Sequence, residues 1–171
     1  MDFETVIKER CSVRHFSDKL VDNDLINKMI NAAILAPTAK NKQCFRLYIV
    51  KSEEGLAKID SVSKCRYNAP YVAIFTYRED EMFVNEEIAE INSGIQDATI
   101  VATHFMLEAT NLGIDTCWIN LFNNYVLEKT FNFDSIEHSV LIMPFGYRLE
   151  GVHPSKLHNL RKSKDELVKK L

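Results

Sequence analysis

The chain of 171 residues has little glycine and no glycine-rich loop. Its five glycines stand too far apart to form GxGxxG or GxxxxGK(S/T), the patterns that cradle phosphates in dinucleotide-binding folds and P-loop proteins. A GxSxG nucleophile elbow is absent as well. These absences exclude a Rossmann dinucleotide site and a P-loop site, and they leave a triad hydrolase without support.

Cysteine pairs and an excess of positive charge are also lacking. The four cysteines form no CxxC pair and have no histidine at zinc-finger spacing, so no metal site is expected. We expect them to stay thiols that pack as small apolar groups. The 21 Lys and Arg residues against 24 Asp and Glu give a net charge of −3, which argues against a nucleic-acid partner held by positive charge.

Long hydrophobic runs are missing from a composition that is nevertheless 46% hydrophobic. No apolar run reaches the roughly 18 residues that a membrane span needs, and MDFETVIKER at the N-terminus lacks the pattern of an export signal. No repeat or linker divides the chain. We therefore expect a single domain over residues 1–171, in the cytoplasm, with no membrane partner.

The spacing of apolar residues predicts a compact α+β unit. The expected helices cover residues 2–11, 22–36, 52–64, 86–112, 125–131 and a short stretch after the capping-box spacing at 163–166. The expected strands cover residues 44–50, 71–77, 115–119 and 139–145. Pro144 predicts an edge or a bulge in the last strand. Between Ile95 and Ala109 the longest helix is apolar on more than one side, which predicts contact with a second copy of the chain.

The segment RCSVR is the most suggestive motif. Arg10, Ser12 and Arg14 alternate, and an extended chain points every second side chain to the same side. Two guanidiniums and a hydroxyl at one spot suit a phosphate, to which arginine offers forked donors. Solvated arginines beside a helix end would show the same spacing, so both interpretations stay open on spacing alone.

Four segments read together resemble the nitroreductase family of FMN-dependent oxidoreductases. They are RCSVRHF (10–16), APTAKNKQ (36–43), LGIDTCWI (112–119) and FGY (145–147), and the likeness in order and spacing extends over about residues 2–168. The resemblance implies a three-layer α+β fold, in which helices flank a central, mainly antiparallel sheet and a long central helix lies at a dimer interface. It also implies a homodimer with FMN at the interface, and NADH or NADPH as a transient electron donor.

The resemblance further implies roles for particular residues. Those that match the phosphate and ribityl contacts are Arg10, Cys11 through its backbone, Ser12 and Arg14. Arg161, with Lys162 beside it, matches a late basic residue that closes on the same phosphate. The residues that match the loop reaching the partner subunit's flavin are Pro37, Thr38, Ala39 and Asn41. The residues that match the segment beside the isoalloxazine, where a main-chain N–H can bond to flavin N5, are Ile119, Asn120 and Leu121.

Some positions have a simpler interpretation or depart from the family pattern. Asn41 would serve equally as a turn residue, and Trp118 as a core anchor. The departures are Cys11 for a common arginine, Cys44-Phe45 for Pro-Trp, Asn120-Leu121 for Gly-Gly or Glu-Gly, and Tyr147-Arg148 for Tyr-Pro. The phosphate contacts survive these changes, whereas side chains at Asn120, Leu121 and Phe45 would line or crowd the flavin face.

The implied activity is hydride transfer from NAD(P)H through flavin N5 to a small electron-poor acceptor, such as a nitroaromatic or a quinone, in a ping-pong cycle. No catalytic side chain is required, because the cofactor carries the chemistry. Two alternatives stay open: a flavin store or sensor without significant turnover, and a same-fold enzyme that dehalogenates its substrate or modifies flavin. The sequence leaves open the physiological acceptor, the choice of NADH or NADPH, and transfer of one or two electrons.

Overall fold

A four-stranded antiparallel sheet forms the centre of the protein, whose computed structural model describes residues 1–171. The strands are β1 (Phe45–Val50), β2 (Tyr71–Arg78), β3 (Asp115–Thr116) and β4 (Glu137–Gly146). They lie in the order β1-β2-β4-β3, and every neighbouring pair is antiparallel. This is the mainly antiparallel central sheet that was expected.

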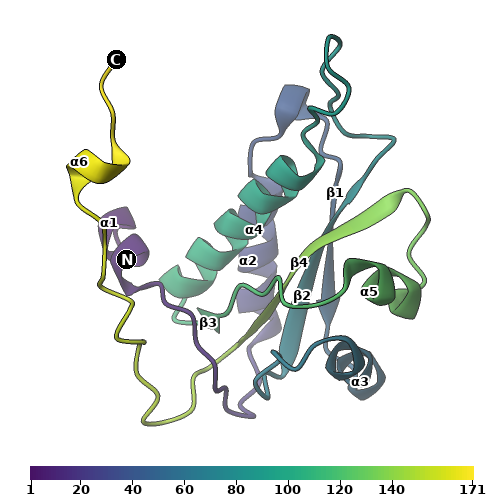
Figure 1. Cartoon of the computed structure of the whole chain (residues 1–171). Coiled ribbons are helices and arrows are strands. Elements are labelled where there is room, and N and C mark those ends of the chain that lie inside the picture. Colours follow the sequence, from purple (N-terminus) through teal and green to yellow (C-terminus); the bar gives the residue numbers. More distant parts are fainter.

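Helices cover both faces of this sheet (Figure 1). The longer ones are α2 (Asn23–Ile34), α3 (Glu53–Val62), α4 (Gly94–Asn111) and α5 (Asn124–Phe131). The core on one face is built with α2 and α4, and the core on the other face with α3 and α5. The short elements α1 (Phe3–Glu9), a 3-10 turn η1 (Ala39–Asn41) and α6 (Lys164–Leu167) lie at the periphery. The three-layer α+β arrangement is confirmed.

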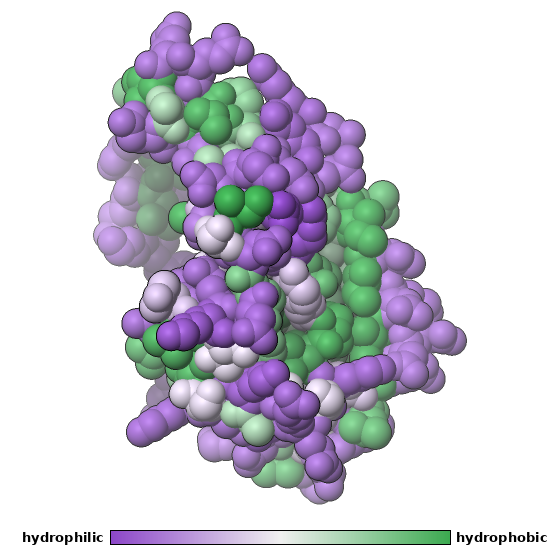
Figure 2. All heavy atoms as spheres, turned by 90° about the vertical axis from the view of Figure 1, so that its right-hand side faces the viewer, coloured by the Kyte–Doolittle hydropathy of each residue, from purple (hydrophilic) through white to green (hydrophobic).

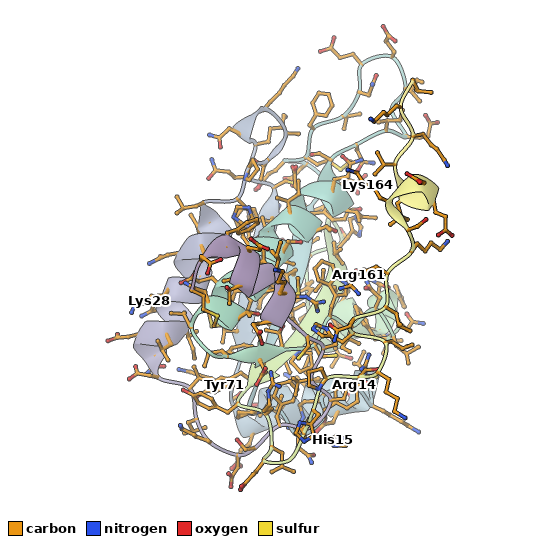
Figure 3. All side chains as sticks on the ribbon, turned by 90° about the vertical axis from the view of Figure 1, so that its left-hand side faces the viewer. Arg14, His15, Lys28, Tyr71, Arg161 and Lys164 are labelled. Carbon is orange, nitrogen blue, oxygen red and sulfur yellow. The ribbon has the colours of Figure 1, made fainter.

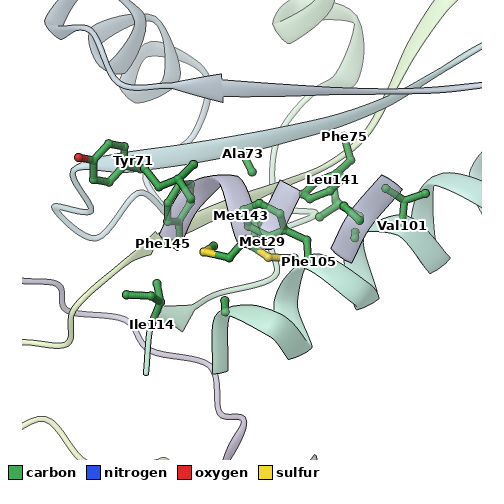
Figure 4. Packing of buried hydrophobic residues seen from close by; sticks show 14 of the residues in the cluster. Met29, Tyr71, Ala73, Phe75, Val101, Phe105, Ile114, Leu141, Met143 and Phe145 are labelled. Atoms are coloured by element: carbon green, nitrogen blue, oxygen red, sulfur yellow. The ribbon is translucent and has the colours of Figure 1, made fainter. Parts of the chain in front are cut away.

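Alternation along β2 divides the core between the two faces. Ala73 and Phe75 belong to the cluster with α2 and α4, whereas Val72 and Ile74 belong to the cluster with α3 and α5. Phe105 of α4 meets Phe75 edge-on, with ring centroids 5.6 Å apart (Figure 4). Because successive side chains of a strand point to opposite faces, one buried strand serves both cores.

Capping side chains explain where several helices begin. Asp2, Asp22 and Ser52 each accept a hydrogen bond from an N–H in the first turn of the helix expected to start there. The capping box of Ser163 and Glu166 is present too, although α6 has only four residues. These helix starts are confirmed because the cap is a local interaction that the sequence already contains.

The longest helix is shorter than its apolar spacing predicts. Helix was expected over residues 86–112, but α4 covers Gly94–Asn111 and residues 79–93 form turns and a bridge. Within those turns the Asn85 carboxamide oxygen accepts two backbone N–H groups further along, a local bond that competes with helix. Ile91 is 49% exposed, so the apolar residues of this stretch have no core to face.

Pro144 lies inside a central strand, so the expectation of an edge or bulge at this residue is wrong. β4 is paired on both sides, and its irregularity lies at Val140 and not at Pro144: Phe75 and Thr76 of β2 pair with Leu141 and Ser139, so Val140 is skipped. The Pro144 carbonyl accepts a hydrogen bond from the Cys117 N–H at 3.0 Å, so its ring nitrogen faces the same side. β3 has already ended there, which makes the missing N–H tolerable.

The C-terminal tail runs beside α1 and away from the sheet (Figure 1). His158 Nε2 lies 3.0 Å from the Lys8 carbonyl oxygen, which ties the tail to the N-terminal segment. Leu157 and Leu160 of the tail are 71% and 65% exposed. None of the helices combines the length and the apolar content that crossing a bilayer requires.

Candidate functional site

A hollow beside α1 brings together the two basic segments singled out in the sequence. Its volume is about 400 Å³, and its lining residues are Arg10, Cys11, Ser12, Arg14, Ser155, Leu157, His158 and Arg161. Figure 3 shows Arg14, near the start of the chain, and Arg161, on the tail, on the same side of the molecule. The tail therefore closes one wall of a hollow whose other wall is the segment after α1.

The segment after α1 is extended, as its alternation predicts. The Val13 N–H donates to the Thr116 carbonyl at 3.0 Å, and Ser12 pairs with Thr116 in a parallel bridge. Cys11 and Val13 are buried at 5% and 3% exposure, whereas Arg14 is exposed. The buried side chains anchor the segment to the sheet edge, and the side chains between them are left for the hollow.

The charged side chains that line the hollow are all positive. The arginines outside it each pair with a carboxylate: Arg46 with Glu81, Arg66 with Asp60, Arg78 with Asp80 and Arg148 with Asp115. Arg10, Arg14 and Arg161 form no ion pair, and no carboxylate lines the hollow. Arg161 Nη1 donates to the His158 and Leu160 carbonyl oxygens, at 2.6 and 2.7 Å, and its other guanidinium donors make no protein hydrogen bond. These donors, and those of Arg10 and Arg14, are therefore available to an anion.

His158 and Ser155 belong to this hollow but were missed by sequence reasoning. The five histidines stand singly along the chain, and no spacing links His158 to an arginine. Because its Nε2 faces a carbonyl oxygen, that nitrogen carries the proton and Nδ1 remains the second polar atom of the ring. Only the path of the tail across α1 brings these two residues to the arginines.

The segment 119–121 continues along the same edge of the sheet. Ile119 exchanges both backbone hydrogen bonds with Ile142, at 3.0 and 3.1 Å. The N–H groups of Asn120 and Leu121 donate to no protein group. The Asn120 carboxamide oxygen accepts from the half-buried Trp118 indole at 2.7 Å. Of the three residues predicted beside the flavin, Asn120 and Leu121 thus keep a free N–H and Ile119 does not.

The loop with Pro37, Thr38 and Asn41 lies at the other end of α4. The Ala39 N–H donates to Asp97 Oδ1 at 3.0 Å in the first turn of that helix, whereas the arginine hollow lies near its last turn. The length of α4 separates the two by roughly 25 Å. Within one subunit the structure therefore does not bring this loop to the arginines.

A larger hollow, of about 580 Å³, has a different character. Its lining includes Glu9, Asp115 and Arg148. Arg148 Nε donates to Asp115 at 2.9 Å, and this pairing raises the pKa of the Arg148 guanidinium. Since its cation is already paired and Glu9 adds negative charge, this hollow does not suit an anion.

Comparison with known proteins identifies the family. The model of the nitroreductase family matches residues 7–66 and 64–147, so the chain belongs to the nitroreductase family. A protein of Methanothermobacter thermautotrophicus, provisionally named NADH dehydrogenase/NAD(P)H nitroreductase, is 28% identical over an alignment of 161 residues. The match covers 88% of this chain and 80% of that protein. These likenesses support a general oxidoreductase role.

Solved structures agree with the fold. A nitroreductase family protein from Clostridium difficile is 26% identical, with a TM-score of 0.91 over 99% of this chain and 98% of its own. A Staphylococcus epidermidis protein, provisionally named NAD(P)H:FMN oxidoreductase, shares the fold at 20% identity, with a TM-score of 0.86 over 99% of this chain and 96% of its own. The predicted family and fold are thus confirmed.

Proposed function

We propose that the chain is an FMN-dependent oxidoreductase that takes hydride from NAD(P)H and passes it to a small electron-poor acceptor, such as a nitroaromatic or a quinone, in a ping-pong cycle. One observation carries the proposal: the arginines without a carboxylate partner meet in a single hollow that no carboxylate lines. Membership of the nitroreductase family supports it, as does the flavin in the name of the Staphylococcus epidermidis protein.

The residues of the hollow fit the phosphate of FMN. Arg10, Arg14 and Arg161 would neutralise the phosphate charge and the Ser12 hydroxyl would add a further donor. Each charge-assisted hydrogen bond is worth about 1.5–3 kcal/mol. Lys162, next to Arg161, would add positive charge nearby.

The sheet edge fits the rest of an elongated mononucleotide. From Thr116, which pairs with Ser12, to Asn120 the chain extends roughly 13 Å. A flavin whose phosphate lies in the hollow would reach along this edge to the free N–H groups of Asn120 and Leu121. One of these would donate a hydrogen bond to flavin N5.

When bound, FMN would supply the acceptance and donation of hydride. The protein's part is to hold the phosphate, to orient the ring and to offer a surface for the acceptor. Leu121 and Tyr125 are 77% and 72% exposed, and Figure 2 shows hydrophobic atoms at the surface on the side where α5 lies. A planar apolar acceptor would pack against such a surface.

We also propose a homodimer in which each FMN lies between the subunits. Phe3 of α1, Leu35 after α2 and Ile95 of α4 are 70%, 80% and 60% exposed, which is unusual for large apolar side chains on three neighbouring elements. The loop with Thr38 and Asn41 is too far from the arginines of its own subunit to share their ligand. A second copy would bring that loop to the flavin.

The colour of the purified protein tests the proposal first, because bound oxidised flavin makes a protein yellow. Steady-state oxidation of NADH and NADPH, with a quinone or a nitroaromatic as acceptor, tests turnover. Steady turnover is expected, whereas a store or sensor would be reduced slowly or not at all. A colourless protein that takes up no FMN in a titration would contradict the assignment.

A further inference from the structure

Asp97 is a buried carboxylate that the proposed chemistry does not use. It lies in the first turn of α4, is 2% exposed and pairs with no cation. Its Oδ1 accepts from the Ala39 N–H at 3.0 Å. Its Oδ2 accepts from the Ser93 hydroxyl at 2.8 Å and from the Cys44 thiol at 3.5 Å. Because burying a carboxylate is costly even with such donors, filling the core does not explain its presence.

The donors to Asp97 come from three different segments. Ala39 begins the turn η1 after α2, and Cys44 directly precedes β1. Ser93 also accepts a hydrogen bond from the Phe83 N–H at 3.1 Å, so it ties down the turns before α4. One carboxylate thus fixes the beginning and the end of the loop between α2 and β1, together with the neighbouring turns.

This loop is strained. The residues with left-handed backbone are Lys40 with φ of 50°, Asn41 with 54° and Gln43 with 51°. Asparagine adopts this conformation readily, but lysine and glutamine hold it only when the surroundings impose it, and such residues gather at binding sites. The same loop carries Thr38 and Asn41, which are the proposed contacts to the partner subunit's flavin.

We propose that Asp97 is a positioning residue of the flavin site, whose carboxylate holds the loop of residues 37–43 in the shape that meets the ring. This inference rests on the proposed function. In the proposed site three arginines would hold the phosphate, so the loop would contact the ring, and Asp97 would affect the ring only by holding the loop. Its loss therefore changes the surroundings of the ring and leaves the phosphate contacts in place.

The test uses the FMN-loaded protein and the graded variants Asp97→Ala and Asp97→Asn. An asparagine keeps an oxygen for the Ala39 N–H, so it preserves part of the interaction. The alanine variant is expected to raise the Kd for FMN on the order of tenfold, and the asparagine variant less. At saturating FMN, the visible circular dichroism of the bound flavin should change more in the alanine variant than in the asparagine variant.

Two control variants separate positioning from stability and from phosphate binding. Glu137 is also a buried carboxylate, 6% exposed, and accepts from the Tyr48 and Thr76 hydroxyls, so Glu137→Gln should cost stability without altering the flavin spectrum. Arg161→Ala should weaken FMN binding yet leave the spectrum at saturation unchanged. Should Asp97→Ala fail to fold, the Kd for FMN and the flavin spectrum are compared between the wild type and the variants Asp97→Asn and Ser93→Ala, since Ser93 donates to Asp97.

The outcomes distinguish this inference from the proposed function. Folded Asp97 variants with the native Kd and spectrum would overturn the positioning role and leave the proposed function intact. A spectrum that changes equally in Glu137→Gln would overturn it as well. A wild-type protein that binds no FMN would overturn the proposed function and this inference together.

Discussion

Charge pairing, at the scale of single residues, separates the arginines of this chain into two groups. Arg66, for example, donates to both oxygens of Asp60, at 2.7 Å each, and serves the fold. Arg14 and Arg161 have no such partner and lie at one hollow. A guanidinium without a carboxylate partner keeps its charge and the donors that the backbone does not use for a ligand. The pairing pattern therefore identifies candidate site residues that sequence spacing leaves ambiguous.

The first prediction concerns these arginines. Arg10→Ala together with Arg161→Ala removes two charge-assisted contacts and should weaken FMN affinity by about 3–6 kcal/mol, on the order of a hundredfold or more. Titration with FMN, followed by the quenching of flavin fluorescence, measures the change. Arg66→Ala is the matched control, since this arginine is paired and lies outside the hollow; its affinity should stay at the wild-type value. An unaltered affinity in the double variant would refute the phosphate assignment.

The second prediction concerns the Cys44 thiol. Burial, with Asp97 beside it, raises the pKa of Cys44 from 9.0 to about 11. The thiol ionises at a lower pH in the unfolded chain than in the folded protein. The stability that the protonated thiol contributes is therefore complete below pH 9 and is lost as the pH rises towards 11. Urea unfolding across this range should show a steeper loss for the wild type than for Cys44→Ala. Tyr48, whose pKa is raised to about 12, also lowers stability as the pH rises, but equally in both proteins. The difference in stability between the wild type and Cys44→Ala therefore reports on the thiol alone. Parallel curves for the two proteins would contradict the prediction.

At the scale of elements, α4 has a glycine near each end, and each position requires glycine for a different physical reason. Gly94 begins the helix against the ring of Tyr77, where an added Cβ would lie 2.4 Å from a ring atom. Gly113 follows the helix with φ of +75° and open space around it. The first position is constrained by close packing, and the second by backbone conformation alone.

The third prediction uses this difference. Gly113→Ala should cost about 1–2 kcal/mol, the usual penalty for a left-handed alanine. Gly94→Ala should cost about 2–3 kcal/mol through overpacking, and much less in a Tyr77→Ala background where the ring is gone. Equilibrium urea unfolding measures all of these variants. Equal costs of Gly94→Ala in both backgrounds would show that the ring is not the reason.

Element prediction succeeded where the determinant was local. Asp22 and Ser52 cap helices because their side-chain oxygens reach N–H groups only two or three residues away. The start of α4 was misplaced because apolar spacing continues through Ile88 and Ile91, although neither side chain meets a core. Periodicity shows which residues could share a face, whereas the fold determines whether anything covers that face.

On the scale of the whole molecule, exposed apolar surface is the feature that the single chain leaves unexplained. It extends over α1, the end of α2, α4 and the tail, for example at Phe3 and Leu157, which are 70% and 71% exposed. Surface of this extent on neighbouring elements is typical of an interface. It agrees with the second copy that the proposed flavin site requires.

The fourth prediction tests that second copy. Ile95→Glu places a charge on the exposed side of α4, where Ile95 is 60% exposed. If this side lies at the interface, the dimer dissociation constant should rise on the order of a hundredfold or more, because the charge would be buried without a partner. Sedimentation velocity over a range of concentrations measures it, and FMN affinity should fall in parallel. Val126→Glu, on the exposed side of α5, is the control and should leave the dimer intact. A wild-type protein that is monomeric in solution would contradict the proposal that two subunits share each flavin site.

The sequence by itself determined the features that depend on neighbours along the chain: the helix caps, the alternation of Arg10, Ser12 and Arg14, and the four motifs in register that indicated the family. The resemblance already implied that Arg161 closes on the phosphate held by Arg10 and Arg14. Only the tertiary structure decided that His158 and Ser155 join these arginines, and that Asp97 bonds both ends of a distant loop. The physical reason is that these encounters depend on where packed elements carry the chain, and a contact between residues far apart in sequence leaves no periodic trace in either segment.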